Sequence, residues 1–172
     1  MDLLVLADGR LLAQGRWYRC ALGWGGVVVA KREGDGGTPA GRYPLRELFY
    51  RPDRLPRPAT RLPVRALRRH DGWCDDPDDA RYNRPVRLPY PASAERLWRA
   101  DALYDLLAVI GYNDDPPRPG LGSAIFLHVA PPAGRPTAGC VALPRPALLD
   151  VLHGLGPGSM VEIRGIGALA QR

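Results

Sequence analysis

The sequence predicts a mainly β fold with one or two short helices. Its 19 Pro and 20 Gly residues are scattered along the chain, and both residue types interrupt helices and central strands. Short apolar or alternating runs lie between them, which is the pattern of strands joined by tight turns. A chain of 172 residues that is 45% hydrophobic is long enough for one substantial core. We therefore expect a single domain over residues 1–172.

The first third of the chain supplies several of the expected strands. Residue types favoured in sheets predict strands at residues 3–7, 16–22 and 26–31. The segment 34–41 is expected to be a loop, because glycines and Thr38-Pro39 are typical of turns. Residues 51–63 contain too many prolines for a central strand and predict an edge strand or a surface segment.

The middle of the chain is less regular. Residues 70–92 show no stable period and are expected to form a long ordered loop, a kind of segment that tends to carry function. Ser93 is a suitable N-cap, so we expect a short helix over residues 94–99. Residues 103–112 fit a helix and a strand equally well.

The last third has clearer periodicity. Residues 124–130 alternate between two faces and predict a strand. Residues 144–155 predict a helix with Leu148, Leu149 and Leu152 on one face, and with a proline near its start and glycines at its end. Residues 160–163 predict a final strand.

The formal net charge of +6 does not indicate a nucleic-acid-binding protein. All but one of the 24 basic residues are Arg, Lys31 being the exception. They form no dense block interleaved with aromatic residues. The mild positive field would instead attract an anionic peptide.

The cysteines indicate neither a disulfide framework nor a zinc ribbon. Cys20, Cys74 and Cys140 cannot all pair, and none has C-x-x-C spacing. Cys74 lies beside the acidic residues of segment 75–79, which raises the alternatives of a calcium-like loop or a metal site formed with His128 and Cys140. The spacing fits neither kind of site, so we expect no metal and no cofactor.

The first residues do not follow the pattern of an export signal. The apolar run Leu3–Leu6 is cut short by Asp8, Gly9 and Arg10, whereas a secretory signal needs a basic start and a longer apolar stretch. No stretch reaches the roughly 20 apolar residues that span a bilayer. We expect a cytoplasmic protein with no membrane partner. A longer native N-terminus would make the periplasm or the cell wall the alternative.

The segment from His128 to Cys140 contains the residues suited to catalysis. A thiol with a pKa of about 8.5 needs a nearby base to act as a nucleophile at neutral pH. The intervening loop is rich in Pro and Gly and lets the two residues meet. Gly139 permits a backbone geometry that would direct amide N–H groups at a developing oxyanion. We predict Cys140 as the nucleophile and His128 as its base.

These residues resemble the signature of the L,D-transpeptidase catalytic domain family (YkuD type). That signature is a His, a variable loop, then Ser or Thr, His, Gly and Cys, usually followed by Val and by Arg or Asn. The matching positions are His128, Thr137, Gly139, Cys140 and Val141. An upstream segment also resembles the family's Thr-Pro-x-Gly block through Thr38, Pro39 and Gly41. The resemblance covers about residues 26–165.

Two positions depart from the signature. The family's second His is Ala138 here, and its Arg or Asn is Ala142. The second His is thought to support the oxyanion site or the substrate. The departures therefore suggest altered substrate contacts, while the nucleophile and base are intact.

The resemblance implies a YkuD-like β-sandwich that acts on a peptidoglycan tetrapeptide stem. Its cysteine would attack the bond between the L-centre of a diamino acid and the terminal D-Ala. D-Ala leaves, and the acyl-enzyme on Cys140 is resolved by an amine, giving an L,D-crosslink, or by water, giving L,D-carboxypeptidase activity. The resemblance further implies that a backbone carbonyl orients His128, and that β-lactams of the carbapenem class are covalent inhibitors.

The sequence favours hydrolysis over crosslinking. Without an export signal, the accessible partners are soluble muropeptides recovered into the cytoplasm, where water is the abundant acceptor. We therefore predict an L,D-carboxypeptidase of muropeptide recycling. An exported transpeptidase that crosslinks the cell wall is the alternative. A second alternative is a wall-fragment binding protein without turnover, for which only Ala138 and Ala142 speak.

Further residues are predicted to line the substrate groove, because aromatic side chains give contact area and a carboxylate can meet the free amine of a diamino acid. The alternatives are a solvated acidic turn and an ordinary strand exit. Thr137 and Gly139 complete the predicted catalytic set. The candidates for substrate contact are Trp73, Asp75, Tyr82, Asn83, Tyr112 and Asn113.

Overall fold

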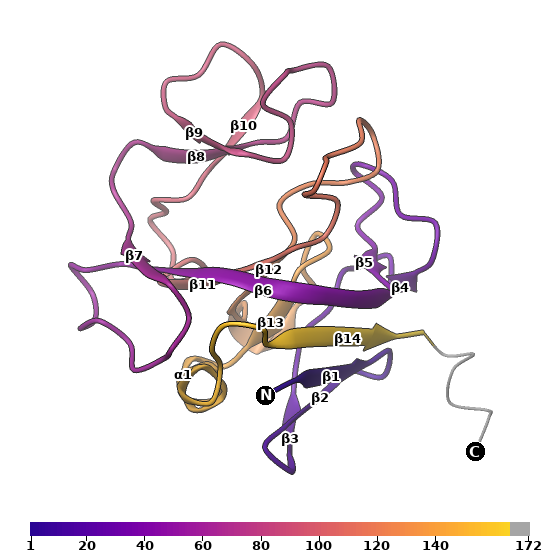
Figure 1. Ribbon diagram of the computed structural model, residues 1–172, viewed down its shortest axis with the longest axis vertical. Coiled ribbons are helices and arrows are strands. Elements are labelled where there is room, and N and C mark those ends of the chain that lie inside the picture. Colours follow the sequence, from indigo (N-terminus) through magenta and orange to yellow (C-terminus); the bar gives the residue numbers. More distant parts are fainter. Residues whose placement is uncertain (166–172) are drawn as a thin grey trace.

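The computed structural model describes residues 1–165 and is built on a nine-stranded mixed sheet (Figure 1). The strand order is β13-β12-β11-β6-β14-β1-β2-β3, with β7 paired to β6 off this path. The strands are β1 (Leu3–Leu6), β2 (Arg10–Ala13), β3 (Arg16–Arg19), β6 (Gly41–Tyr50), β7 (Val64–Ala66), β11 (Leu106–Ile110), β12 (Phe126–Val129), β13 (Val141–Leu143) and β14 (Met160–Arg164).

The segment that follows β3, at one end of the strand order, pairs with the region of β13, at the other end. Beyond β3, the chain forms isolated bridges from Ala21 to Ala142 and from Gly23 to Thr137. Ala21 and Ala142 exchange both backbone hydrogen bonds, at 2.8 and 2.9 Å. The segment that follows β3 therefore lies against β13, and the sheet curves round to enclose its apolar face.

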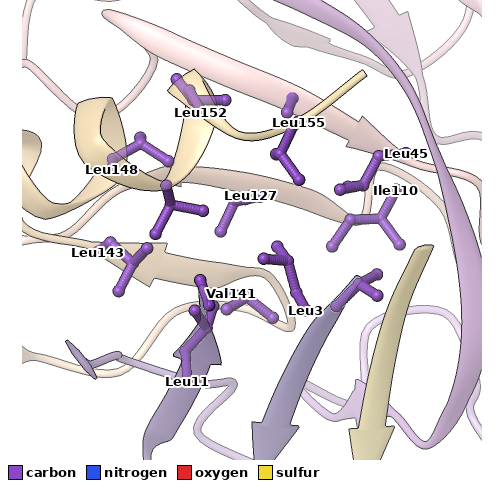
Figure 2. Packing of buried hydrophobic residues seen from close by; sticks show 14 of the residues in the cluster. Leu3, Leu11, Leu45, Ile110, Leu127, Val141, Leu143, Leu148, Leu152 and Leu155 are labelled. Atoms are coloured by element: carbon purple, nitrogen blue, oxygen red, sulfur yellow. The ribbon is translucent and has the colours of Figure 1, made fainter. Parts of the chain in front are cut away.

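The enclosed space holds the larger hydrophobic cluster. It collects the inward side chains of the main sheet together with one helix, α1 (Arg145–His153). The helix buries Leu148, Val151 and Leu152, whereas Leu149 is exposed, so the predicted helical face was wrong at that position. Figure 2 shows side chains of the helix and of several strands converging in this core. Burial of these leucines stabilises the fold by about 1.5–3 kcal/mol each.

A smaller three-stranded sheet covers the other face of the main sheet near the strand that carries His128. Its order is β10 (Ala94–Arg96), β8 (Asp71–Cys74) and β9 (Pro85–Arg87). Between the two sheets lies a second hydrophobic cluster that includes Trp73, Tyr104, Phe126 and Cys140. A two-stranded ribbon, β4 (Val27–Val28) and β5 (Thr38–Pro39), completes the set of strands in the described chain.

The mainly β prediction is confirmed, with 36% strand, 7% helical residues and a mixed β-sheet core. The helix expected over residues 94–99 was wrong, because Ala94–Arg96 is strand β10. A short isolated helix has a costly nucleus. Pairing with β8 satisfies the same backbone groups and places Leu97 in the second cluster. Residues 70–92 likewise contain β8 and β9 rather than one long loop.

Candidate active site

His128 and Cys140 are brought together by neighbouring parallel strands. His128 lies on β12, and its partner across the pair is Ala142 of β13, two residues beyond Cys140. Alternation along β12 places Leu127 in the larger core and Phe126 in the second cluster, so His128 faces the second cluster's side. His128 and Cys140 both line one cavity of about 530 Å³.

The Cys140 thiol is held by the backbone of the segment before β12. Its Sγ donates a hydrogen bond to the Ala124 carbonyl and accepts one from the Phe126 N–H, both at 3.3 Å. The side chain is 7% exposed. Burial, with a smaller contribution from the negative charge of Glu95, raises the pKa of the thiol to about 12. Cys140 is therefore protonated in the resting site.

The His128 imidazole is neutral as well. It is 3% exposed, and desolvation lowers its pKa to about 4. Nδ1 lies 2.8 Å from the carbonyl oxygen of Val129. Because a carbonyl only accepts, we assign the ring proton to Nδ1, which leaves Nε2 as the basic nitrogen. The ring also packs edge-on against Tyr104, with centroids 5.2 Å apart.

A tight turn leads into Cys140, the predicted nucleophile. Thr137 Oγ1 donates to the Cys140 carbonyl at 2.7 Å and accepts from the Gly139 N–H at 3.2 Å. The Gly139 amide is therefore occupied in this state. Within residues 1–165, no group accepts a hydrogen bond from the Cys140 N–H. That amide is the donor available for a developing oxyanion.

The turn packs against the loop that contains the Thr-Pro-x-Gly block. Gly139 has φ +137°, a conformation that favours glycine, and a Cβ there would lie 2.8 Å from the Gly37 carbonyl oxygen. Thr38 is fully buried, and its Oγ1 accepts a hydrogen bond from the Gly23 N–H at 2.8 Å. The block therefore holds the backbone beside the nucleophile.

Of the six residues predicted to contact substrate, Asp75 lines the cavity of Cys140 and His128. Trp73, Asn83 and Tyr112 line a separate cavity of about 350 Å³. Tyr82 donates its hydroxyl to Glu33 and accepts the Gly122 N–H. Asn113 caps its own loop through bonds to Arg118 and Gly122. Roles for these residues in substrate binding stay predictions.

Asn83 has a clear structural place. Its φ of +55° is tolerated better by Asn than by most residues. Its Oδ1 accepts from Trp73 Nε1 and from the Ala124 N–H, and its Nδ2 donates to the carbonyls of Tyr112 and Asn113. Asn83 thus ties the small sheet to Ala124, whose carbonyl accepts the thiol proton of Cys140.

Sequence reasoning missed much of the cavity wall. The missed residues lie on segments far apart in sequence, so spacing gave no signal. Tyr104 fell in the segment that fitted helix and strand equally. Within the described chain, no group of three His, Cys, Asp or Glu side chains is arranged to hold a metal ion. The missed lining residues include Lys31, Glu33, Glu95, Arg99, Tyr104 and Ser123.

A buried cysteine and a neutral histidine that line one cavity, with an unoccupied backbone amide at the cysteine, have the groups that acyl transfer through a cysteine requires. The family model of the L,D-transpeptidase catalytic domain (YkuD) matches residues 2–163, and the chain belongs to that family. It is an L,D-transpeptidase-type enzyme whose cysteine acyl transfer is directed at peptidoglycan peptides.

Neither the search of curated proteins nor the search of solved structures found a match. Over residues 1–165, no helix is long and apolar enough to cross a membrane.

Proposed function

We propose that the protein removes the terminal D-Ala from peptidoglycan tetrapeptides, with water resolving the acyl-enzyme on Cys140. The observation that carries the proposal is the cavity shared by Cys140 and His128. It is large enough for part of a peptide. The family to which the chain belongs supplies the substrate class.

The neutral pair sets the order of proton movements. As Sγ attacks the scissile carbonyl, its proton passes to Nε2 of His128, and the new oxyanion lies against the Cys140 N–H. The intermediate collapses, and the leaving amine of D-Ala takes the proton from His128. Water then attacks the thioester, gives its proton to Nε2, and the thiol leaves protonated. The products are a tripeptide and D-Ala.

Two departures from the family signature support water as the acceptor. Ala138 lines the cavity and is exposed, but its methyl group neither accepts a proton nor orients an incoming amine. Ala142 is buried and occupied by its bridge to Ala21. Neither position offers a polar side chain to an acceptor peptide, and water requires less positioning.

Product analysis tests the proposal. Purified protein is incubated with a synthetic tetrapeptide, with and without an added peptide amine, and products are identified by mass spectrometry. We expect tripeptide and D-Ala in both conditions, and neither from Cys140→Ala. Amine-linked dimers that form faster than tripeptide would instead assign the crosslinking activity.

A carbapenem offers a second test of the nucleophile. We expect a covalent adduct on the wild-type protein and on Cys20→Ala, and none on Cys140→Ala. Absence of both an adduct and tetrapeptide turnover would favour a wall-fragment binding protein. The cytoplasmic location is likewise a proposal, and fractionation of cells that express the native gene tests it.

A further inference from the structure

The wall of the catalytic cavity carries more charged residues than the acyl transfer uses. Three carboxylates, those of Glu33, Asp75 and Glu95, line it together with two cations, Lys31 and Arg99. Which of these five side chains form ion pairs with other residues determines the net charge that the cavity presents to a substrate.

Both cations are neutralised by acids. Lys31 Nζ lies 2.6 Å from Asp35 Oδ1 and also donates to the Arg32 carbonyl. Arg99 donates two hydrogen bonds to Asp101, at 2.9 and 2.6 Å. Each cation is thus compensated by a carboxylate partner that is not among the residues lining the cavity.

None of the three carboxylates forms an ion pair among residues 1–165, although the nearby positive charge of Arg99 offsets part of the charge of Glu95. Glu95 accepts the hydroxyl of Tyr104 at 2.5 Å, and Glu33 accepts the hydroxyls of Tyr82 and Ser123. Hydroxyl donors orient a carboxylate but do not cancel its charge. Burial raises the pKa of Glu95, because its surroundings disfavour the charged form.

The side-chain carboxylate of Asp75 is unpaired among residues 1–165. Neither carboxylate oxygen accepts a hydrogen bond or forms an ion pair there, and Oδ1 is shielded from solvent. A carboxylate oxygen that is shielded from water and has no partner costs free energy, and a cation that binds beside it offsets the cost. The cavity therefore has a place for a positive group close to the nucleophile.

We propose that Asp75 and Glu95, supported by Glu33, bind the free side-chain ammonium of the diamino acid and so determine which stem peptides are cleaved. This inference rests on the proposed function. An ammonium offers three donors and reaches several carboxylates at once. Charge-assisted hydrogen bonds of this kind are about twice as strong as neutral ones.

The test compares two tetrapeptides that differ only in whether the side-chain amine is free or acetylated. The quantity measured is kcat/KM for D-Ala release, with no amine acceptor added, so that the donor peptide alone is probed. We expect wild type to prefer the free amine on the order of 10- to 100-fold, the range of one or two charge-assisted bonds.

Three variants test which carboxylates cause the preference for the free amine. In Asp75→Asn and Glu95→Gln the ratio should fall toward one, whereas Asp78→Asn, exposed on the same loop, should keep the wild-type ratio. Thermal unfolding controls for misfolding, and Asp75→Asn should be at least as stable as wild type because its carboxylate has no partner. Equal cleavage of the two peptides by wild type, or an unchanged ratio in both cavity variants, would overturn the inference.

If neither peptide is cleaved, the proposed function fails, and equilibrium binding still decides the inference. Calorimetric titration of wild type with the same two peptides gives their affinities. Tighter binding of the free amine would support recognition by the acidic wall. Equal affinities, or no binding of either peptide, would contradict it.

Discussion

At the scale of single residues, Cys140 and His128 differ from a preformed ion pair. The thiol has a pKa of about 12 and the imidazole a pKa of about 4, both because the groups are buried. Sγ is bonded to the Ala124 carbonyl and the Phe126 N–H rather than to His128. In the proposed reaction, the proton therefore moves as the substrate is attacked.

Alkylation of Cys140 should reflect this neutral state. The rate of reaction with iodoacetamide, followed at Cys140 by peptide mapping, should rise about tenfold per pH unit from pH 7 to 9 without a plateau, because the thiolate fraction is still small. A plateau below pH 8 would indicate a thiolate that is already present at rest.

His128 should make the protein sensitive to acid. Its pKa is near 6.5 when unfolded and about 4 when folded. The unfolded chain thus binds the proton more readily between these values, and the free energy of unfolding falls as the pH drops from 6.5 toward 4. The full effect is on the order of 3 kcal/mol.

Urea unfolding of wild type and His128→Gln at pH 7.5 and pH 4.5 isolates this contribution. Carboxylates that titrate in both proteins cancel in the comparison, and the variant should lose less stability on acidification. The same loss in both proteins would mean that His128 is not the responsible group.

At the scale of elements, two loops hold the segments that contact Cys140. One is the turn 137–140, closed by Thr137. The other joins β8 to β9 and reaches Ala124 through Asn83. Each loop is fixed by several hydrogen bonds of one side chain, Thr137 in the first loop and Asn83 in the second. Each can therefore be tested with a conservative and a disruptive substitution.

Thr137→Val should lower kcat by about tenfold or more, because it removes the hydroxyl that bonds both the Gly139 N–H and the Cys140 carbonyl. Thr137→Ser keeps the hydroxyl and should retain most of the activity. Steady-state D-Ala release measures both. Similar rates in the two variants would show that the hydroxyl is dispensable.

Asn83→Ala should lower the free energy of unfolding by about 2–4 kcal/mol, because four polar groups lose their partner. Asn83→Asp keeps the acceptor for Trp73 and Ala124 but loses both donors, so an intermediate loss is expected. Chemical denaturation gives the values. Equal stability of Asn83→Ala and wild type would contradict the assignment.

At the scale of the whole molecule, closure of the sheet brings three glycine-containing segments into contact. A Cβ on Gly23 would lie 2.0 Å from the Gly36 carbonyl oxygen and 2.9 Å from the Gly139 Cα. The bridge from Gly23 to Thr137 closes the sheet at this point. The fold and the active site therefore depend on the same close backbone approach.

Gly23→Ala should consequently reduce both the melting temperature and the activity. Gly15→Ala is a suitable comparison, because a Cβ there meets nothing within 4 Å although φ is +75°. It should cost about 1 kcal/mol from backbone strain and leave turnover unchanged. Calorimetry and D-Ala release distinguish the two variants, and equal effects would argue against the packed junction.

Local patterns explain what the sequence could predict. The strand of His128, the helix α1 and the last strand each have a period that one segment carries by itself. The small sheet was missed because Ala94 pairs with Cys74, a contact that no local period encodes. Cys140 and His128 were predicted from a sequence motif, because a thiol nucleophile needs a base. The acidic wall was largely missed, because its members converge only after folding.

The position of β14 between β6 and β1 has a consequence for biosynthesis. β1 and β6 both precede β14 by more than a hundred residues in the chain, yet they are joined only through it. Until residues 160–164 leave the ribosome, both early segments present open edges that invite pairing with other chains. The main sheet is therefore continuous only once β14 has joined β6 to β1.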